Sequence, residues 1–131
     1  MSTSRFWASR FQDQVMLITG AAQGIGQRVA ERAAAEGGRL VLVDRADVVH
    51  EVVAALTEQG HEAVALQADL ETWEGAEGVM RQACERFGRI DILINNVGGA
   101  INFKPFVEFT ETEISAEITR SPMPTPWCSR P

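Results

Sequence analysis

Three glycines near the start of the chain have the spacing of a phosphate-binding turn. They are Gly20, Gly24 and Gly26, in the run Thr-Gly-Ala-Ala-Gln-Gly-Ile-Gly that begins at Thr19. A turn without side chains lets its backbone approach a pyrophosphate, and a following helix supplies N–H groups and the positive end of its dipole. Glycines also serve tight turns and close packing where no ligand binds. The absence of Gly-Lys-Ser/Thr excludes a Walker-type nucleotide loop.

An acidic residue stands about 20 residues beyond these glycines, the distance typical of dinucleotide-binding domains. Asp44 closes an apolar run, where a carboxylate can accept hydrogen bonds from the ribose hydroxyls of NAD and would repel the 2′-phosphate of NADP. Arg45 follows directly and could instead pair with a 2′-phosphate. We expect NAD as the cofactor. The alternative for Asp44 is a solvated carboxylate at a strand end.

Alternating strands and helices must position these residues. Short apolar runs predict buried strands at residues 15–19, 40–44, 63–66 and 90–94. Apolar residues at helical spacing predict helices between the strands, each ending at a glycine: Gly37, Gly60 and Gly88. The pattern predicts an α/β fold, a Rossmann-type doubly wound parallel sheet with strand order 3-2-1-4 and helices on both faces.

The pattern weakens after residue 98. Thr110 to Glu113 has the form of a capping box and predicts a further helix. That helix should end near Arg120, because three prolines follow within five positions, each without an N–H and each restricting the residue before it. We therefore expect a domain at residues 1–120 and a Pro-rich tail at 121–131.

Charge and composition narrow the possible partners. A net charge of −6 with Lys104 as the only lysine argues against nucleic acid, whose binders cluster cations against phosphates. No run is long and apolar enough for a signal peptide or a membrane helix, so we expect a cytoplasmic protein with reduced cysteines. His50 and His61 lack the neighbours of a metal site and are expected on the surface.

Three motifs together resemble those of the short-chain dehydrogenases/reductases. They are Thr-Gly-x-x-x-Gly-x-Gly at 19–26, Asp69-Leu70 after the third strand, and Asn-Asn-Val-Gly at 95–98. The resemblance covers about residues 11–120 and implies that Asp69 faces the adenine of NAD while Asn96 and Gly98 line the nicotinamide side. The cofactor contacts that we expect are Gly20, Gln23, Gly24, Ile25, Gly26, Asp44, Asp69, Leu70, Asn96 and Gly98.

Two of these motifs, Asp69 and the pair Asn95-Asn96, could instead have purely structural roles. Asp69 could be the N-cap of the helix that follows it. The amides of Asn95 and Asn96 could form a hydrogen-bonded clasp at the end of the fourth strand.

Residues between the motifs resemble a narrower group, the cis-diol dehydrogenases of benzoate catabolism. These residues are the run from Asn95 to Phe106, an Arg-Phe pair near the start and Leu-Val-Asp-Arg at 42–45. The resemblance implies NAD-dependent oxidation of a dihydroxycyclohexadiene carboxylate to a catechol, in a homo-oligomeric parent enzyme. Another alcohol or ketone substrate remains open, because the fold does not define the substrate.

The catalytic residues of the family are not present in the sequence. The family uses a Tyr as acid/base, a Lys four residues later and a Ser, whereas this chain has no tyrosine. Lys104 precedes Pro105 in a loop and is expected to be a solvated or substrate-loop residue. Ser121 stands where the family has an Asn.

The resemblance therefore implies the N-terminal half of the fold, inactive alone, with one sheet edge and part of one face uncovered. No catalytic residue and no metal ligand can be named. A regulatory nucleotide-binding module and a non-functional gene fragment are the alternatives.

Overall fold

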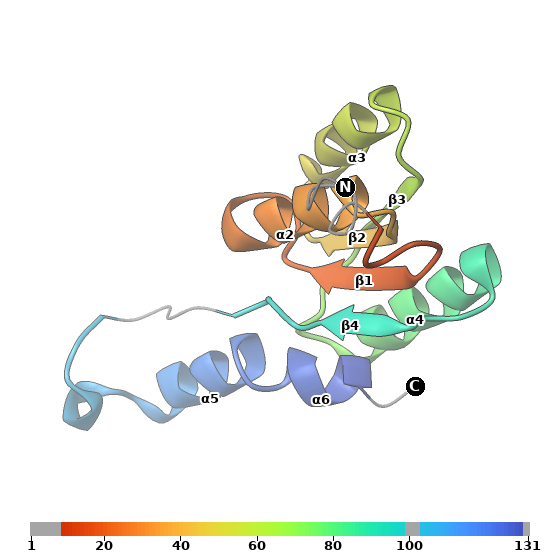
Figure 1. The fold of residues 1–131 in the computed structure, drawn as a ribbon. Helices are drawn as coiled ribbons and strands as arrows, with labels where there is room; N and C mark the ends of the chain where they lie inside the picture. The colour runs from red at the N-terminus through yellow and green to blue at the C-terminus, as the bar shows by residue number, and fades with distance from the viewer. Residues whose placement is uncertain (1–8, 99–102, 130–131) are drawn as a thin grey trace.

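The strands form one parallel sheet in the predicted order. The computed structural model describes residues 9–98 and 103–129, so residues 99–102 of the resemblance and the end of the expected tail lie outside the described residues. The sheet order is β3-β2-β1-β4. Its strands are β1 (Val15–Thr19), β2 (Arg39–Asp44), β3 (Ala63–Gln67) and β4 (Ile92–Ile94). The expected strand order 3-2-1-4 is confirmed (Figure 1).

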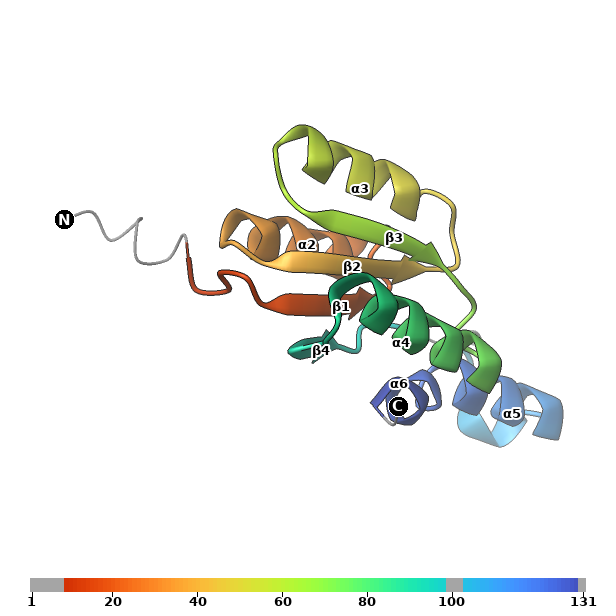
Figure 2. The ribbon, with the colours of Figure 1, turned by 90° about the vertical axis from the view of Figure 1, so that its right-hand side faces the viewer.

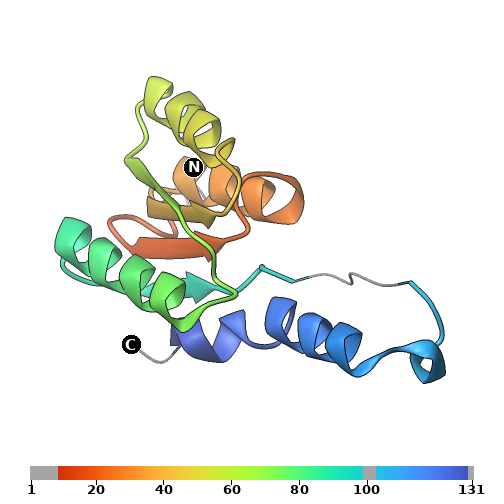
Figure 3. The same ribbon diagram turned by 180° about the vertical axis from the view of Figure 1, so that it is seen from behind.

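Three helices follow the first three strands, as the apolar spacing predicted. They are α2 (Gly24–Ala35), α3 (Val49–Glu58) and α4 (Trp73–Phe87). After β4 come a short 3-10 helix (Phe106–Glu108), α5 (Glu111–Arg120) and α6 (Pro124–Ser129). The capping box is confirmed, because the Thr110 hydroxyl accepts a hydrogen bond from the Glu113 N–H at 3.2 Å. The 3-10 helix and α5 extend beyond the sheet (Figure 3).

Alternate residues of β1 separate two apolar cores on opposite faces of the sheet. Met16 and Ile18 pack with the buried residues of α2 and α3. Val15 and Leu17 pack with those of α4 and with Cys128 of α6. This alternation follows from the period of two in a strand, and it places helices on both faces as expected (Figure 2).

The predicted Pro-rich tail at 121–131 contains a helix in its described part. Residues Pro124–Ser129 form α6, and Cys128 on it is 2% exposed in the core beside α4. The prolines permit this helix because Pro124 and Pro126 lie in its first turn, where backbone N–H groups have no partner within the helix. The face of the sheet next to β4 is thus partly covered, whereas β4 pairs only with β1 among the described residues.

A buried carboxylate joins the segment before β1 to the end of α2. The Glu36 side chain is 2% exposed and accepts hydrogen bonds from Arg10 at 2.6 and 2.7 Å and from Arg32 at 3.0 Å. The hydrogen bond from Arg10 is the main cause that lowers the pKa of Glu36, against the opposing effect of burial. The ionised form of Glu36 therefore favours the folded state.

This pair predicts a pH-dependent difference between the wild type and Glu36→Gln. A lowered folded-state pKa adds stability that is present above the unfolded value of about 4.3 and is lost as pH falls through the folded value. We expect Glu36→Gln to lower the urea midpoint at pH 7, with the difference shrinking below about pH 4. Glu31→Gln, which removes an exposed carboxylate paired with Arg28, should change the midpoint little. A difference independent of pH would contradict this role for the charge.

Candidate functional site

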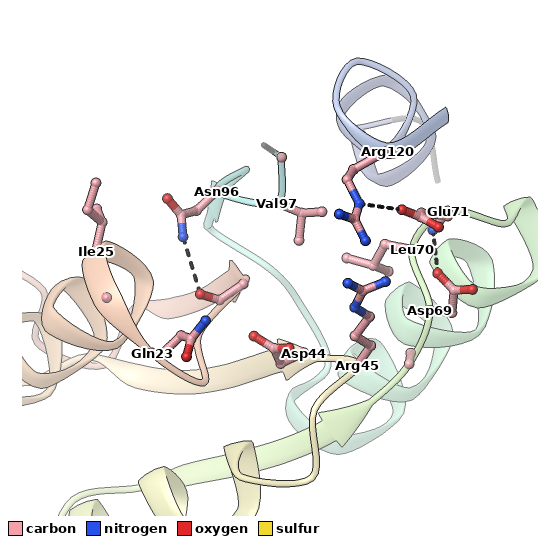
Figure 4. Close-up of a pocket in the computed structure, with 14 residues that line it drawn as sticks. Gln23, Ile25, Asp44, Arg45, Asp69, Leu70, Glu71, Asn96, Val97 and Arg120 are labelled. Atoms are coloured by element: carbon pink, nitrogen blue, oxygen red, sulfur yellow. Dashed lines mark hydrogen bonds and ion pairs between the residues drawn. The ribbon is translucent and has the colours of Figure 1, made fainter. Parts of the chain in front are cut away.

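A pocket of about 370 Å³ lies at the carboxyl ends of the four strands. The first turn of α2, the end of β2, the loops after β3 and β4 and the end of α5 form its wall (Figure 4). Nine of the ten predicted contact residues line it: Gly20, Gln23, Gly24, Ile25, Asp44, Asp69, Leu70, Asn96 and Gly98. Residues separated by up to about 80 positions in sequence therefore meet at one place, as ligands do at the strand ends of open α/β sheets.

The glycine turn needs its glycines for two different reasons. Gly24 has a φ of +59°, a conformation that side chains disfavour, and a Cβ added there would meet no protein atom within 4 Å. Gly26, the tenth predicted residue, does not line the pocket. A Cβ on Gly26 would overlap the carbonyl of Gly20 and lie 2.7 Å from Nδ2 of Asn96. Gly24 thus leaves space beside the pocket, whereas Gly26 permits close packing behind the turn.

The N-terminus of α2 has none of the acidic groups that the other long helices place there. Its N-cap, Gln23, makes no side-chain cap hydrogen bond, and its first turn holds no acidic residue. By contrast, Thr72 and Thr110 cap α4 and α5, whose first turns include Glu74 and Glu111. The positive end of the α2 dipole therefore faces the pocket without a carboxylate from its own first turn to offset it.

Asp44 fastens the end of β2 to the glycine turn. Its Oδ2 accepts a hydrogen bond from the Ala22 N–H at 3.0 Å, and its Oδ1 accepts one from the Ala46 N–H at 3.0 Å. A carboxylate offers about four acceptor positions, so these two bonds leave capacity for hydroxyl donors in the pocket. Asp44 is therefore a half-exposed strand-end carboxylate that is also a hydrogen-bonded part of the pocket wall.

Asp69 orders the loop after β3 but is not the cap of α4. Its Oδ1 accepts a hydrogen bond from the Glu71 N–H at 2.9 Å. Thr72 is the N-cap instead, accepting from the Gly75 N–H at 3.0 Å. The N-cap alternative for Asp69 is wrong because the helix begins three residues later than that role needs. Leu70, 4% exposed, belongs both to the pocket wall and to the core over α4.

The clasp expected at the end of β4 is present for Asn96. Its Nδ2 donates a hydrogen bond to the Gly20 carbonyl at 3.2 Å, and its backbone N–H donates to the Thr19 hydroxyl at 2.9 Å. Asn95 lies on the other side, with Nδ2 donating to the Ser129 hydroxyl on α6 at 3.3 Å. Asn96 thus has both a structural role and a place in the pocket wall.

Sequence reasoning missed several residues of the wall. The pocket is also lined by Ala68, Glu71, Val97 and Arg120, and by Arg45, for which the sequence suggested only a contact with a 2′-phosphate. Nε of Arg120 donates a hydrogen bond to Oε1 of Glu71 at 3.1 Å, joining residues 49 positions apart. No local pattern could have indicated this pair. Ser121 lies next to Gly98, since a Cβ on that glycine would come within 3.0 Å of the Ser121 hydroxyl.

Lys104 is exposed, as the sequence suggested, but its side chain is also paired. Its ammonium lies 2.6 Å from Oε2 of Glu113 and 5.6 Å from the ring centre of Phe109. The hydrogen bond from Lys104 is the main cause that lowers the pKa of Glu113. The lysine therefore ties the segment before α5 to the first turn of that helix.

Neither a metal site nor a membrane-spanning helix occurs in the part of the chain that the structure describes. There, no group of three or more His, Cys, Asp or Glu side chains could hold a metal ion. No described helix is long and apolar enough to cross a membrane. Cys84 and Cys128 are both free, and burial raises the pKa of the Cys128 thiol.

Comparison with known families identifies the protein family to which this pocket belongs. The family model described as short chain dehydrogenase matches residues 14–130. This chain belongs to the short-chain dehydrogenase family. Its match includes the glycine turn, β2, the loops after β3 and β4, and α5, which together form the pocket.

Individual relatives match nearly all of this short-chain dehydrogenase sequence. A 1,6-dihydroxycyclohexa-2,4-diene-1-carboxylate dehydrogenase from Pseudomonas putida is 59% identical over 119 residues, which cover 91% of this chain and 44% of the relative. The enzyme of the same name from Acinetobacter baylyi is 54% identical, with 92% and 46% covered. The chain therefore spans less than half the length of these curated relatives.

A solved structure agrees with the fold. A short-chain dehydrogenase/reductase from Burkholderia phymatum in complex with NAD superposes with a TM-score of 0.83 at 27% identity. The match covers 92% of this chain and 43% of that one. The described residues therefore share the fold of the part of that structure that they match.

The contact behind the glycine turn predicts the effect of Gly26→Ala. The added methyl must displace the Gly20 carbonyl or the Asn96 amide, so we expect a loss of about 1–3 kcal/mol in the free energy of unfolding. Gly78→Ala is the matched control, because its Cβ would meet nothing closer than 3.9 Å inside α4. Urea unfolding should show that control to be equal or more stable, by about 0.5–1 kcal/mol. Equal stability of Gly26→Ala and the wild type would contradict the close packing.

Proposed function

We propose that the pocket binds NAD and that the chain is the cofactor-binding part of an oxidoreductase acting on a secondary alcohol or cis-dihydrodiol. The observation that carries this proposal is the convergence of nine predicted contact residues on one pocket. The α2 N-terminus, which has no capping side chain or first-turn carboxylate, meets the same pocket. An anion is stabilised at such a helix end by N–H groups and by the dipole.

The residues present fit the parts of a dinucleotide in order. The turn around Gly24 would hold the pyrophosphate, because a side chain at that position would occupy the open space beside the pocket. Asp44 would accept hydrogen bonds from the ribose hydroxyls, and Asp69 with Leu70 would flank the adenine. Asn96 would lie near the nicotinamide ring, which would accept a hydride when bound.

The choice between NAD and NADP depends on Asp44 and Arg45. Both line the pocket, so both charges bear on the ribose position. The Asp44 carboxylate is held there by two backbone N–H groups and would repel a 2′-phosphate. Because Arg45 is exposed and its guanidinium makes no hydrogen bond or ion pair with the described residues, we give the ordered carboxylate more weight. The NAD complex of the Burkholderia phymatum relative supports the same choice.

The substrate is proposed from the relatives. Both carry the name 1,6-dihydroxycyclohexa-2,4-diene-1-carboxylate dehydrogenase and are 54% and 59% identical to this chain. We propose a cis-dihydrodiol carboxylate as the substrate class of the parent enzyme, with a catechol as the product.

Removing the Asp44 carboxylate should weaken NAD binding. Asp44→Ala loses a charged acceptor for the ribose hydroxyls, worth about 1.5–3 kcal/mol, or roughly a 10- to 150-fold rise in Kd. Asp44→Asn removes the charge but keeps the shape of the side chain, so it separates these two contributions to binding. Asp47→Ala, an exposed residue outside the pocket, is the control and should bind like the wild type. Calorimetric titration with NAD measures all four proteins, and an unchanged Kd for Asp44→Ala would remove Asp44 from the site.

The 131-residue polypeptide should not turn over substrate by itself. Its sequence holds no tyrosine, so no phenol can accept the substrate proton near neutral pH. General acid–base assistance is worth about 10²- to 10⁴-fold in rate. Incubation with NAD and a cis-dihydrodiol carboxylate, or with a panel of secondary alcohols, should produce no NADH absorbance above a control without protein. Turnover that persists after repurification from a host lacking related enzymes would overturn this expectation.

A further inference from the structure

Arg120 enters the pocket from the side opposite the glycine turn. It is the last residue of α5, and its side chain is 29% exposed. The close-up shows the guanidinium directed from α5 toward Leu70 and the side chain of Arg45 (Figure 4). The bond to Glu71 uses Nε, so the plane of the group is oriented by a residue of the loop after β3.

The location of the adenine follows from the proposed function, on which this inference rests. If Asp44 holds the ribose, the base lies one glycosidic bond away from that sugar. The wall beyond Asp44 is formed by residues 68–71, and Arg120 faces this stretch. Leu70 is an apolar residue of this wall, although its side chain is only 4% exposed and packs mainly in the core.

A structural role alone explains Arg120 poorly. Its partner Glu71 is also 29% exposed, and an ion pair with that much solvent adds little stability. The helix that carries Arg120 has no buried residue among positions 111–120. A planar guanidinium does, however, stack on aromatic faces, and a purine presents such a face.

We propose that Arg120 stacks on the adenine of the bound cofactor and that Glu71 is its positioning residue. The base would lie between this guanidinium and the wall formed by Leu70. The pair links α5 to the loop after β3, so binding of the base would draw two separate elements onto one ligand.

The test compares ligands that contain adenine with one that does not. Wild type, Arg120→Ala and Arg120→Lys are titrated with NAD, ADP-ribose and nicotinamide mononucleotide, followed by protein NMR. We expect Arg120→Ala to weaken NAD and ADP-ribose by the same factor, about 3- to 30-fold, and to leave the mononucleotide unchanged. Arg120→Lys should not restore affinity, because an ammonium keeps the charge but not the plane. Glu71→Gln should give a smaller loss confined to the same two ligands.

Each other outcome overturns the proposal in a recognisable way. An equal loss of affinity for all three ligands would show that Arg120 acts in folding. Full affinity in Arg120→Lys would show that Arg120 acts through its charge rather than through stacking. A larger loss for NADP than for NAD would make it a phosphate contact. If wild type binds NAD and Arg120→Ala binds it equally well, only the stacking is wrong. If wild type binds neither NAD nor ADP-ribose, the proposed function fails as well.

Discussion

The hydroxyl of Thr19 holds together two sides of the pocket, the end of β1 with its glycine turn and the loop after β4. It accepts hydrogen bonds from the backbone N–H groups of Asn96 at 2.9 Å and Val97 at 3.2 Å, and lies 3.4 Å from the Ile94 carbonyl, to which it can donate. The side chain is 1% exposed, so these groups would lack partners if the hydroxyl were removed. One buried hydroxyl thus joins the end of β1 to the loop after β4, two segments about 75 residues apart. The Asn96 amide and the close approach of Gly26 reinforce the same junction.

This junction compensates for the weakness of the last strand. β4 spans three residues, all half-buried, and pairs with β1 alone among the described residues. β1, by contrast, is buried along its whole length and pairs on both sides. The loop after β4 is therefore positioned less by its own strand than by hydrogen bonds to the residues that close β1. The site and the edge of the fold share their stabilising contacts, so a ligand that touches both walls would also stabilise β4 by mass action.

The fold and most of the site follow from local patterns, whereas the exceptions follow from contacts distant in sequence. Apolar runs, glycine stops and right-handed crossovers left few arrangements of four parallel strands, and the order 3-2-1-4 is the one found. The strand-end motifs converge because carboxyl ends of parallel strands share one edge. The local sequence pattern did not predict α6. Its prolines are tolerated because they lie in the first turn of the helix, whatever their number. The local pattern also failed for Arg120 with Glu71 and for Lys104 with Glu113, because ion pairs formed by folding have no signature in sequence spacing.

A net charge of −6 does not prevent this pocket from accepting the dianionic pyrophosphate of a dinucleotide, because its own carboxylates are already engaged. Asp44 accepts two backbone N–H groups, Asp69 accepts one, and Glu71 is paired with Arg120. Each hydrogen bond or ion pair places a positive group beside a carboxylate and so offsets part of its negative charge. The α2 N-terminus, Arg45 and Arg120 then supply positive potential where phosphates and the base would lie. Recognition here would depend on dipoles and hydrogen bonds fixed by the fold rather than on the overall charge of the protein. An acidic composition can therefore argue against a nucleic-acid partner and still permit a nucleotide ligand.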